Sequence, residues 1–226
     1  MSFYAWIILG TIIGPLILSF DQKVGFYRRL SPLLLAIILV GIPFLLWDAY
    51  FVDLKIWGFA EGNIWGIHLG NLPIEECLFF IVVPFACIFI HEVLKAYFPE
   101  IRNSRMAHIF AFTVTFSGFL FGLSNINNAY TSTVCIGSAV LTIGFYFVNR
   151  STWYPSFVLT FLVALIPFLV INGLLTGAFT ALPVVWYSEE HIMGARILTI
   201  PVEDLYYNYC LLLPVVALYE KFKKAQ

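Results

Sequence analysis

Two short acidic motifs are the residues of this chain whose types and spacing could do chemistry. Pro73-Ile74-Glu75-Glu76 and Pro201-Val202-Glu203-Asp204 each place two adjacent carboxyl groups after a proline. A single motif of this kind is typical of helix capping, because proline suits the first helical turn and carboxylates complement the helix dipole. Carboxyl groups that lie close together cannot all ionise, so a neutral acid then stands beside a carboxylate. Such a set can donate one proton and accept another.

The composition of the chain places these motifs in a membrane. Of the 226 residues, 61% are hydrophobic and only 11% are charged, and the mean hydropathy is +0.91. Soluble domains carry about 25% charged residues. The net charge of −1 also leaves no basic surface for nucleic acid. We therefore predict an all-α integral membrane protein and exclude a soluble enzyme, a disordered chain and a nucleic-acid-binding protein.

Seven stretches are long and apolar enough to span a bilayer as helices, which takes about 20 residues. They cover residues 3–20, 31–51, 74–92, 106–123, 131–148, 155–172 and 202–220. Residues 173–188 continue the uncharged run after the sixth stretch, but Gly173, Gly177 and Pro183 interrupt them. We predict an interfacial or re-entrant segment there, with an extra span as the alternative.

Lysine and arginine residues predict how the chain is oriented in the membrane. Ten of the twelve fall in alternate connections and the C-terminal tail, and only Lys55 and Arg196 fall in the others. Cytoplasmic loops carry the excess of these residues. We therefore predict a multi-pass protein of the cell membrane, with its N-terminus outside and its C-terminus in the cytoplasm.

The chain contains a weak internal duplication, which indicates a repeated fold. Besides the acidic motif, Ile42-Pro43-Phe44-Leu45 recurs as Ile166-Pro167-Phe168-Leu169. We predict about seven transmembrane helices, arranged as two parallel three-helix repeats and a connecting helix. The predicted units are residues 1–96, 97–128 and 129–226, within one membrane domain. Both acidic motifs then begin helices at the same, outer surface.

Further polar and aromatic residues fall beside the motifs in this arrangement. Asp48 corresponds to Asn172 in the other half, and His68 corresponds to Arg196. We expect these four to orient the motif carboxylates or to tune their pKa values, Arg196 by holding a neighbour ionised. Aromatic faces stabilise a nearby cation, although Trp and Tyr also anchor any membrane protein at its interfaces. The aromatic candidates beside the motifs are Phe79, Trp186, Tyr187, Tyr206 and Tyr207.

Other kinds of site are not indicated. The sequence has no glycine-rich phosphate-binding loop, no aspartate-rich pair for magnesium and diphosphate, and no lysine in the seventh span for a retinal Schiff base. Its four cysteines lie in apolar runs without metal-site spacing. We expect His91 and His108 at the membrane interface and Glu92 and Glu220 in structural roles. We therefore predict no metal and no cofactor.

Four features together resemble the small membrane-embedded lycopene cyclases. They are the repeated Pro-x-Glu-Glu/Asp motif, Val185-Trp186-Tyr187, Asn172-Gly173 and the terminal Tyr219-Glu220. That family occurs as two subunits in some bacteria and as one fused chain in archaea, other bacteria and fungal bifunctional enzymes. The resemblance covers both halves of the chain, so it implies the fused, single-chain form.

The resemblance implies cyclisation of the linear ψ-ends of lycopene to β-ionone rings, giving γ-carotene and β-carotene without net redox change. Glu75, Glu76, Glu203 and Asp204 would then form the acid–base set, with Glu75 and Glu203 foremost. Which carboxyl group donates the proton and which accepts one stays open. The number of ends cyclised and the choice among β-, γ- and ε-rings also stay open.

Two other classes of function are not excluded. An intramembrane prenyltransferase or other isoprenoid enzyme would need a divalent metal and a diphosphate substrate, and a non-enzymatic carrier would leave its cargo unchanged. The expected partners are lycopene or a related linear carotenoid and membrane lipid, with no nucleic acid. Assembly into a homo-oligomer, or with other carotenoid enzymes, is a further open alternative.

Overall fold

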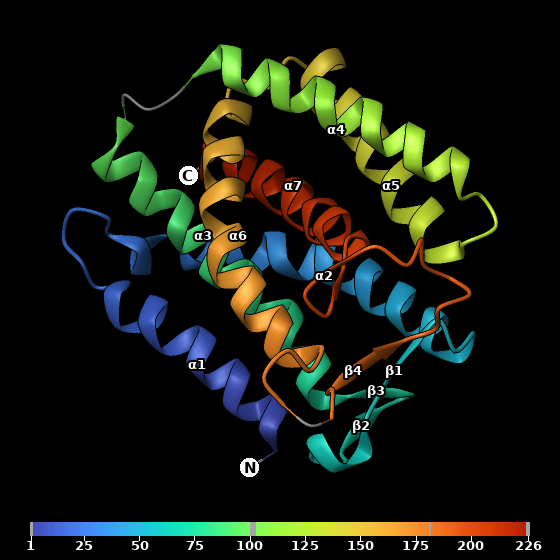
Figure 1. Cartoon of the computed structure of the whole chain (residues 1–226). Helices are drawn as coiled ribbons and strands as arrows, with labels where there is room; N and C mark the ends of the chain where they lie inside the picture. Colours follow the sequence, from blue (N-terminus) through green and yellow to red (C-terminus); the bar gives the residue numbers. More distant parts are fainter. Residues whose placement is uncertain (1, 100–102, 181, 225–226) are drawn as a thin grey trace.

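The computed structural model describes residues 2–99, 103–180 and 182–224, and seven helices dominate these ranges. The helices form one bundle, with α1 and the α4–α5 pair on opposite sides of it (Figure 1). The prediction of an all-α, membrane-type fold is confirmed. In chain order the elements are α1 (Phe3–Leu18), η1 (Phe26–Arg29), α2 (Leu30–Asp53), β1 (Trp57–Phe59), η2 (Glu61–Asn63), β2 (His68–Leu69), β3 (Leu72–Pro73), α3 (Ile74–Tyr97), α4 (Ser104–Ser124), α5 (Ala129–Thr142), the π-helical η4 (Ile143–Val148), α6 (Tyr154–Leu175), β4 (Val185–Tyr187), β5 (Arg196–Ile197), β6 (Ile200–Pro201) and α7 (Glu203–Lys223).

Each predicted span falls on one of these helices. Five helical segments of the described chain are long and apolar enough to cross a membrane, and α1 is apolar but shorter. The helix α7 is not among the five, because it carries Glu203, Asp204 and Glu220 as well as basic residues. It packs inside the bundle against α2, α3, α5 and α6, so most of its surface meets protein rather than lipid.

The outer surface of the bundle is apolar. On α2, for example, the large side chains that point away from the core include Leu34, Leu35, Ile38, Leu39 and Ile42, each about half exposed. A soluble protein rarely exposes such a continuous apolar surface. This surface is therefore the one expected of helices in contact with lipid.

Proline residues lie inside five of the seven helices. An interior proline removes one backbone hydrogen bond, which membrane helices tolerate where neighbouring helices cover the break. The interior prolines are Pro15, Pro43, Pro84, Pro167 and Pro214.

Short strands, which the sequence analysis did not predict, cover one end of the bundle. Strands β1 and β4 pair antiparallel and join the segment after α2 to the segment after α6. Two small hairpins, β2–β3 and β5–β6, lead directly into α3 and α7. Their turns contain Gly70 at a φ of 66° and Leu198 at 57°. The left-handed conformation suits glycine, whereas at Leu198 it is strained.

The segment after α6 does not form an eighth span. The helix continues to Leu175, and the described residues from 176 to 188 contain turns and strand β4 but no helix. The backbone N–H of Val184 donates to the carbonyl of Leu175 at 2.8 Å, which returns the chain to the end of the helix. The described residues of this segment therefore contain no extra helical span, while its interfacial position stays a prediction.

The two ends of the bundle differ in their polar residues. We define the site end as the end where the first turns of α1, α3, α5 and α7 meet the last turns of α2 and α6. Hydrogen bonds from Tyr4 to Glu76, from Tyr130 to Asp204 and from Tyr207 to Asp48 join these turns. The opposite, basic end includes the ion pairs of η1, α3 and α7. The division into residues 1–96, 97–128 and 129–226 stays a prediction.

Candidate functional site

A cavity lies at the site end, where residues from both halves of the chain meet. Its open space is about 60 Å³. Asp48 comes from the last turns of α2, Glu76 from the first turn of α3 and Asp204 from the first turn of α7. All three carboxyl groups line the cavity and are buried, with exposed fractions of 2%, 8% and 4%. The expectation that the two acidic motifs converge is therefore met.

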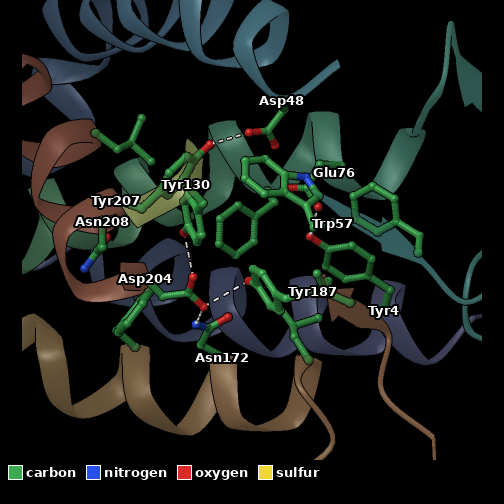
Figure 2. Close-up of a pocket in the computed structure, with 16 residues that line it drawn as sticks. Tyr4, Asp48, Trp57, Glu76, Tyr130, Asn172, Tyr187, Asp204, Tyr207 and Asn208 are labelled. Carbon is green, nitrogen blue, oxygen red and sulfur yellow. Dashed lines mark hydrogen bonds between the residues drawn. The ribbon is translucent and has the colours of Figure 1, made fainter. Parts of the chain in front are cut away.

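Two of these carboxyl groups form a pair on one side of the cavity. Asp48 and Glu76 lie next to each other in the cavity lining (Figure 2). Two carboxyl groups buried side by side cannot both stay ionised, so we expect the pair to hold one proton. The Tyr207 hydroxyl donates to Asp48 Oδ1 at 2.6 Å, and the Tyr4 hydroxyl donates to Glu76 Oε2 at 2.6 Å. The pair can therefore act as a proton donor to the cavity.

The third carboxyl group lies on the other side of the cavity, with aromatic rings between it and the pair (Figure 2). Asp204 accepts hydrogen bonds from the Tyr130 hydroxyl at 2.6 Å, the Asn172 amide at 2.6 Å and the Tyr187 hydroxyl at 3.0 Å. An ionised carboxylate has lone pairs for all three donors. Burial, and then the charge of Asp204, raise the pKa of Tyr187 well above its ordinary value. The Tyr187 hydroxyl therefore stays a neutral donor.

The first acid of each motif lies behind the cavity lining. Glu75 and Glu203 are both fully buried. Glu75 Oε1 accepts from the Ser2 hydroxyl at 2.6 Å and from the Trp65 backbone N–H at 2.7 Å. Glu203 Oε1 likewise accepts from Thr131 and from the backbone N–H of a residue ten positions earlier. These matched contacts hold the loop before each motif, while the predicted duplication stays a prediction.

The structure distinguishes the two acids of each motif by their position. The sequence-based prediction puts Glu75 and Glu203 foremost, whereas Glu76 and Asp204 are the motif acids that line the cavity. Adjacent helical residues point about 100° apart, so only one acid of each pair can face the same space. The sequence alone does not show which acid of each pair faces the cavity, because this depends on how the helix is rotated in the bundle.

Aromatic rings form most of the remaining wall. Trp57 of β1 lies with its ring centroid 5.0 Å from that of Tyr130 and 6.1 Å from that of Tyr207. The rings of Tyr130 and Tyr187 stack at 5.9 Å. Such rings can face a developing positive charge without offering it a nucleophile. Phe79, one of the expected aromatic residues, also lines the cavity.

Five aromatic residues of this wall were not among the sequence-based candidates, namely Tyr4, Trp57, Phe59, Tyr130 and Phe168. The two tyrosines occupy matching positions in the sequence, because Tyr4 lies in the first turn of α1 and Tyr130 in the first turn of α5. Each donates a hydrogen bond to the second acid of a motif, Tyr4 to Glu76 and Tyr130 to Asp204. This match is a signal in the sequence, and Trp57 had no such signal. It reaches the site only because strand β1 folds back over the cavity and pairs with β4.

Besides Glu75 and Glu203, four expected residues do not line the cavity. The Arg196 guanidinium donates to Glu189 at 2.6 Å, so it pairs with a surface acid rather than with a motif carboxylate. His68 is exposed on β2 and does not line the cavity. The Trp186 ring lies over Gly58 on the outer side of the strand pair. Tyr206 donates to Ser117 of α4 at 2.9 Å. Asp48 and Asn172, by contrast, contact the site as expected.

A second cluster of polar side chains lies at the basic end. His91, Glu92 and Glu220 offer ligand atoms within 4.8 Å of one another. His91 is fully buried between Thr160 of α6 and Glu220 of α7. Its expected depth at the membrane interface stays a prediction. Each carboxylate is already paired with basic side chains, namely Arg29, Lys95 and Lys223. The contacts present therefore fit an interhelical ion-pair network better than a metal site.

Comparison with known protein families identifies the chain. Residues 1–94 and 127–222 match the family model described as lycopene cyclase. The two matched segments contain both acidic motifs and all three carboxyl groups of the cavity. Comparisons with curated proteins and with solved structures gave no match. The family match covers most of the chain, which therefore belongs to the lycopene cyclase family.

Proposed function

We propose that this chain is a lycopene β-cyclase in which both halves of one polypeptide build a single active site. The observation that carries the proposal is the cavity itself, where a carboxyl pair and a separate carboxylate face each other across aromatic rings. Acid–base catalysis needs a donor and an acceptor on the same substrate end. The family membership supports a linear carotenoid as that substrate.

The first proposed step is protonation of the substrate by the Asp48–Glu76 pair. The pair delivers its proton to C2 of the terminal C1=C2 double bond, which leaves a cation at C1. The electrons of the C5=C6 bond then attack C1, so that the C1–C6 bond closes a six-membered ring and the positive charge moves to C5. Trp57, Tyr130 and Tyr207 are placed to stabilise this cation through their ring faces.

The second proposed step is loss of a proton to Asp204. Its carboxylate removes the proton from C6, and the C5=C6 double bond of the β-ring forms. The substrate gains and loses one proton, so the product is an isomer and the reaction needs no oxidant, reductant or cofactor. The proton on Asp204 must return to the Asp48–Glu76 pair before the next turnover. Glu75 and Glu203 act as positioning residues in this proposal.

Substitution of the cavity acids tests the proposal. In bacteria that make lycopene, the unmodified protein should produce β-ring carotenoids. Glu76→Gln and Asp204→Asn should each lower the rate of ring formation about a hundredfold or more, because each removes one proton-transfer group. Pigments are separated by chromatography, and membrane insertion is checked by immunoblot. Glu190→Gln, which changes an exposed acid outside the cavity, is the control and should keep full activity.

Three outcomes contradict parts of this proposal. Full conversion by both cavity variants would remove these acids from the mechanism. Unchanged lycopene with the wild-type protein would favour a carrier over a cyclase. An ε-ring or γ-ring product would show that the proton leaves from a carbon other than C6.

We also propose that the site end faces the outside of the cell membrane. The support is the charge distribution, since Arg28, Arg29, Lys95 and Lys223 lie at the basic end while Lys55 and Arg196 lie at the site end. Cytoplasmic ends of membrane helices carry the excess of basic residues. The carboxyl groups of the cavity would then exchange protons with the outer side.

A further inference from the structure

A larger apolar cavity adjoins the acid site. Its volume is about 220 Å³, and it shares Phe79, Phe168 and Asn172 with the wall of the acid site. Its lining comes from α1, α3 and α6 and contains no charged side chain. The adjoining space therefore suits the apolar part of a molecule whose end lies among the carboxyl groups.

This cavity extends deep into the bundle. Along α3 its lining runs from Phe79 to Ile90, which is eleven residues or about 16 Å of helix, roughly half the thickness of a hydrocarbon core. A second hollow, of about 320 Å³, lies between α1 and α6 and shares Gly10, Thr11 and Ile171 with it. The acid site therefore shares wall residues with the apolar cavity, and the apolar cavity shares wall residues with the hollow.

The glycines of α1 show that this side of the bundle is loosely closed. A Cβ atom added at Gly10 would meet no atom within 4 Å. The related side of the second half is different, because α4 packs closely on α5. A Cβ atom at Gly118 of α4 would lie 2.5 Å from the Cys135 carbonyl, and one at Gly122 would lie 2.6 Å from Ile136. In the described structure the connecting helix covers α5, while α1 has no such cover (Figure 1).

We propose that the apolar cavity holds the polyene tail of the substrate and that the tail enters from the bilayer between α1 and α6. The inference rests on the proposed function, since the tail belongs to the molecule whose end is cyclised. A linear polyene fits because it is long, narrow and without polar groups. Its tail can remain in apolar surroundings from the lipid to the acid site. Gly10 and Thr11 would border the entrance.

A bulky residue at Gly10 tests the proposal with a matched control. Gly10 lies in the wall that the cavity and the hollow share, and an added Cβ atom there meets open space, so Gly10→Phe fills this wall without an initial clash. Gly14 is on the same helix and also meets open space, but it lines neither the cavity nor the hollow, so Gly14→Phe is the control. Phenylalanine at this position competes with the tail for the same space, and an overpacked fit of this kind weakens binding about tenfold. We therefore expect Gly10→Phe to lower the cyclisation rate in membrane vesicles about tenfold at limiting lycopene and Gly14→Phe to leave it unchanged.

A binding measurement separates this inference from the proposed function. Both glycine changes are placed in Asp204→Asn protein, which should bind lycopene without converting it. The absorbance of lycopene that copurifies should fall about tenfold with Gly10→Phe and stay constant with Gly14→Phe. If the two variants copurify with equal amounts of lycopene, the proposed tail site is wrong, while the proposed acid site is unaffected. Loss of copurified phospholipid without loss of lycopene would assign the cavity to a lipid chain. An inactive wild-type protein would instead contradict the proposed function.

Discussion

Adjacent acids in each motif have different neighbours, and this difference separates their roles. Glu76 and Asp204 meet tyrosine hydroxyl groups at the cavity. Glu75 and Glu203 meet a backbone N–H and a serine or threonine hydroxyl behind it. In the proposed mechanism, each motif therefore provides one acid for proton transfer and one for holding the preceding loop.

Two substitutions of Glu75 distinguish a positioning role from a chemical one. Glu75→Gln keeps an oxygen that can accept from Ser2 and Trp65, so we expect cyclisation within a few fold of wild type. Glu75→Ala leaves these two donors without their acceptor and should lower the free energy of unfolding by about 2 kcal/mol. The measurements are pigment yield and thermal unfolding in detergent. A folded Glu75→Gln protein as inactive as Glu76→Gln would place Glu75 in the proton transfer.

Residue identity predicted much of the site but not its arrangement. Burying an acid in a membrane costs free energy, so the acids of the repeated motif could be recognised as candidates from their spacing in the sequence alone. Arg196 could not be excluded in this way, because its pairing with Glu189 depends on the path of the loop between β4 and β5. Tyr4 lies 72 residues from its partner Glu76, so no local pattern joins them.

The strand pair β1–β4 is the element that closes the site over its aromatic wall. It brings Trp57 and Tyr187 into register, and both line the cavity. Gly58 is required for this closure, because a Cβ atom there would lie 2.4 Å from the Trp186 ring. The strands hold residues from both halves of the chain together.

Replacement of Gly58 should loosen this cover. Gly58→Val forces the Trp186 ring away and should lower the free energy of unfolding by about 1–3 kcal/mol. Trp186→Ala removes the obstructing ring, so the double variant should recover part of the loss. Thermal unfolding in detergent and proteolysis of the β4 segment report the change. Gly62→Ala, where an added Cβ meets open space, is the control. Equal stability of Gly58→Val and Gly62→Ala would contradict this role.

Helices were predictable and strands were not, for a physical reason. A span of about 20 apolar residues has few alternatives in a bilayer, so each predicted stretch falls on a helix. Ile74–Tyr97 runs five residues past the predicted end at 92, since the ion pairs of Glu92 and Lys95 allow the helix to continue at the basic end. Strands of two or three residues have no periodicity to detect.

The distribution of charge over the whole molecule predicts its orientation. With the basic end in the cytoplasm, the C-terminal tail after Lys223 is cytoplasmic. A reporter enzyme that is active only outside the cytoplasm should therefore be inactive when fused to the C-terminus. The same reporter inserted after Glu190, in the loop at the site end, should be active. Activity of the C-terminal fusion would reverse the proposed orientation.

The uncovered side of α1 has a consequence for a substrate with two identical ends. If the tail enters by the proposed route, one gap leads to one set of acids, so a symmetric substrate places one end in the site while its other end stays among the lipid tails. After the first ring closes, the molecule would have to leave, turn around and enter again by its other end. Each binding event would then form one ring, and the one-ring intermediate would return to the bilayer, where a neighbouring enzyme could take it.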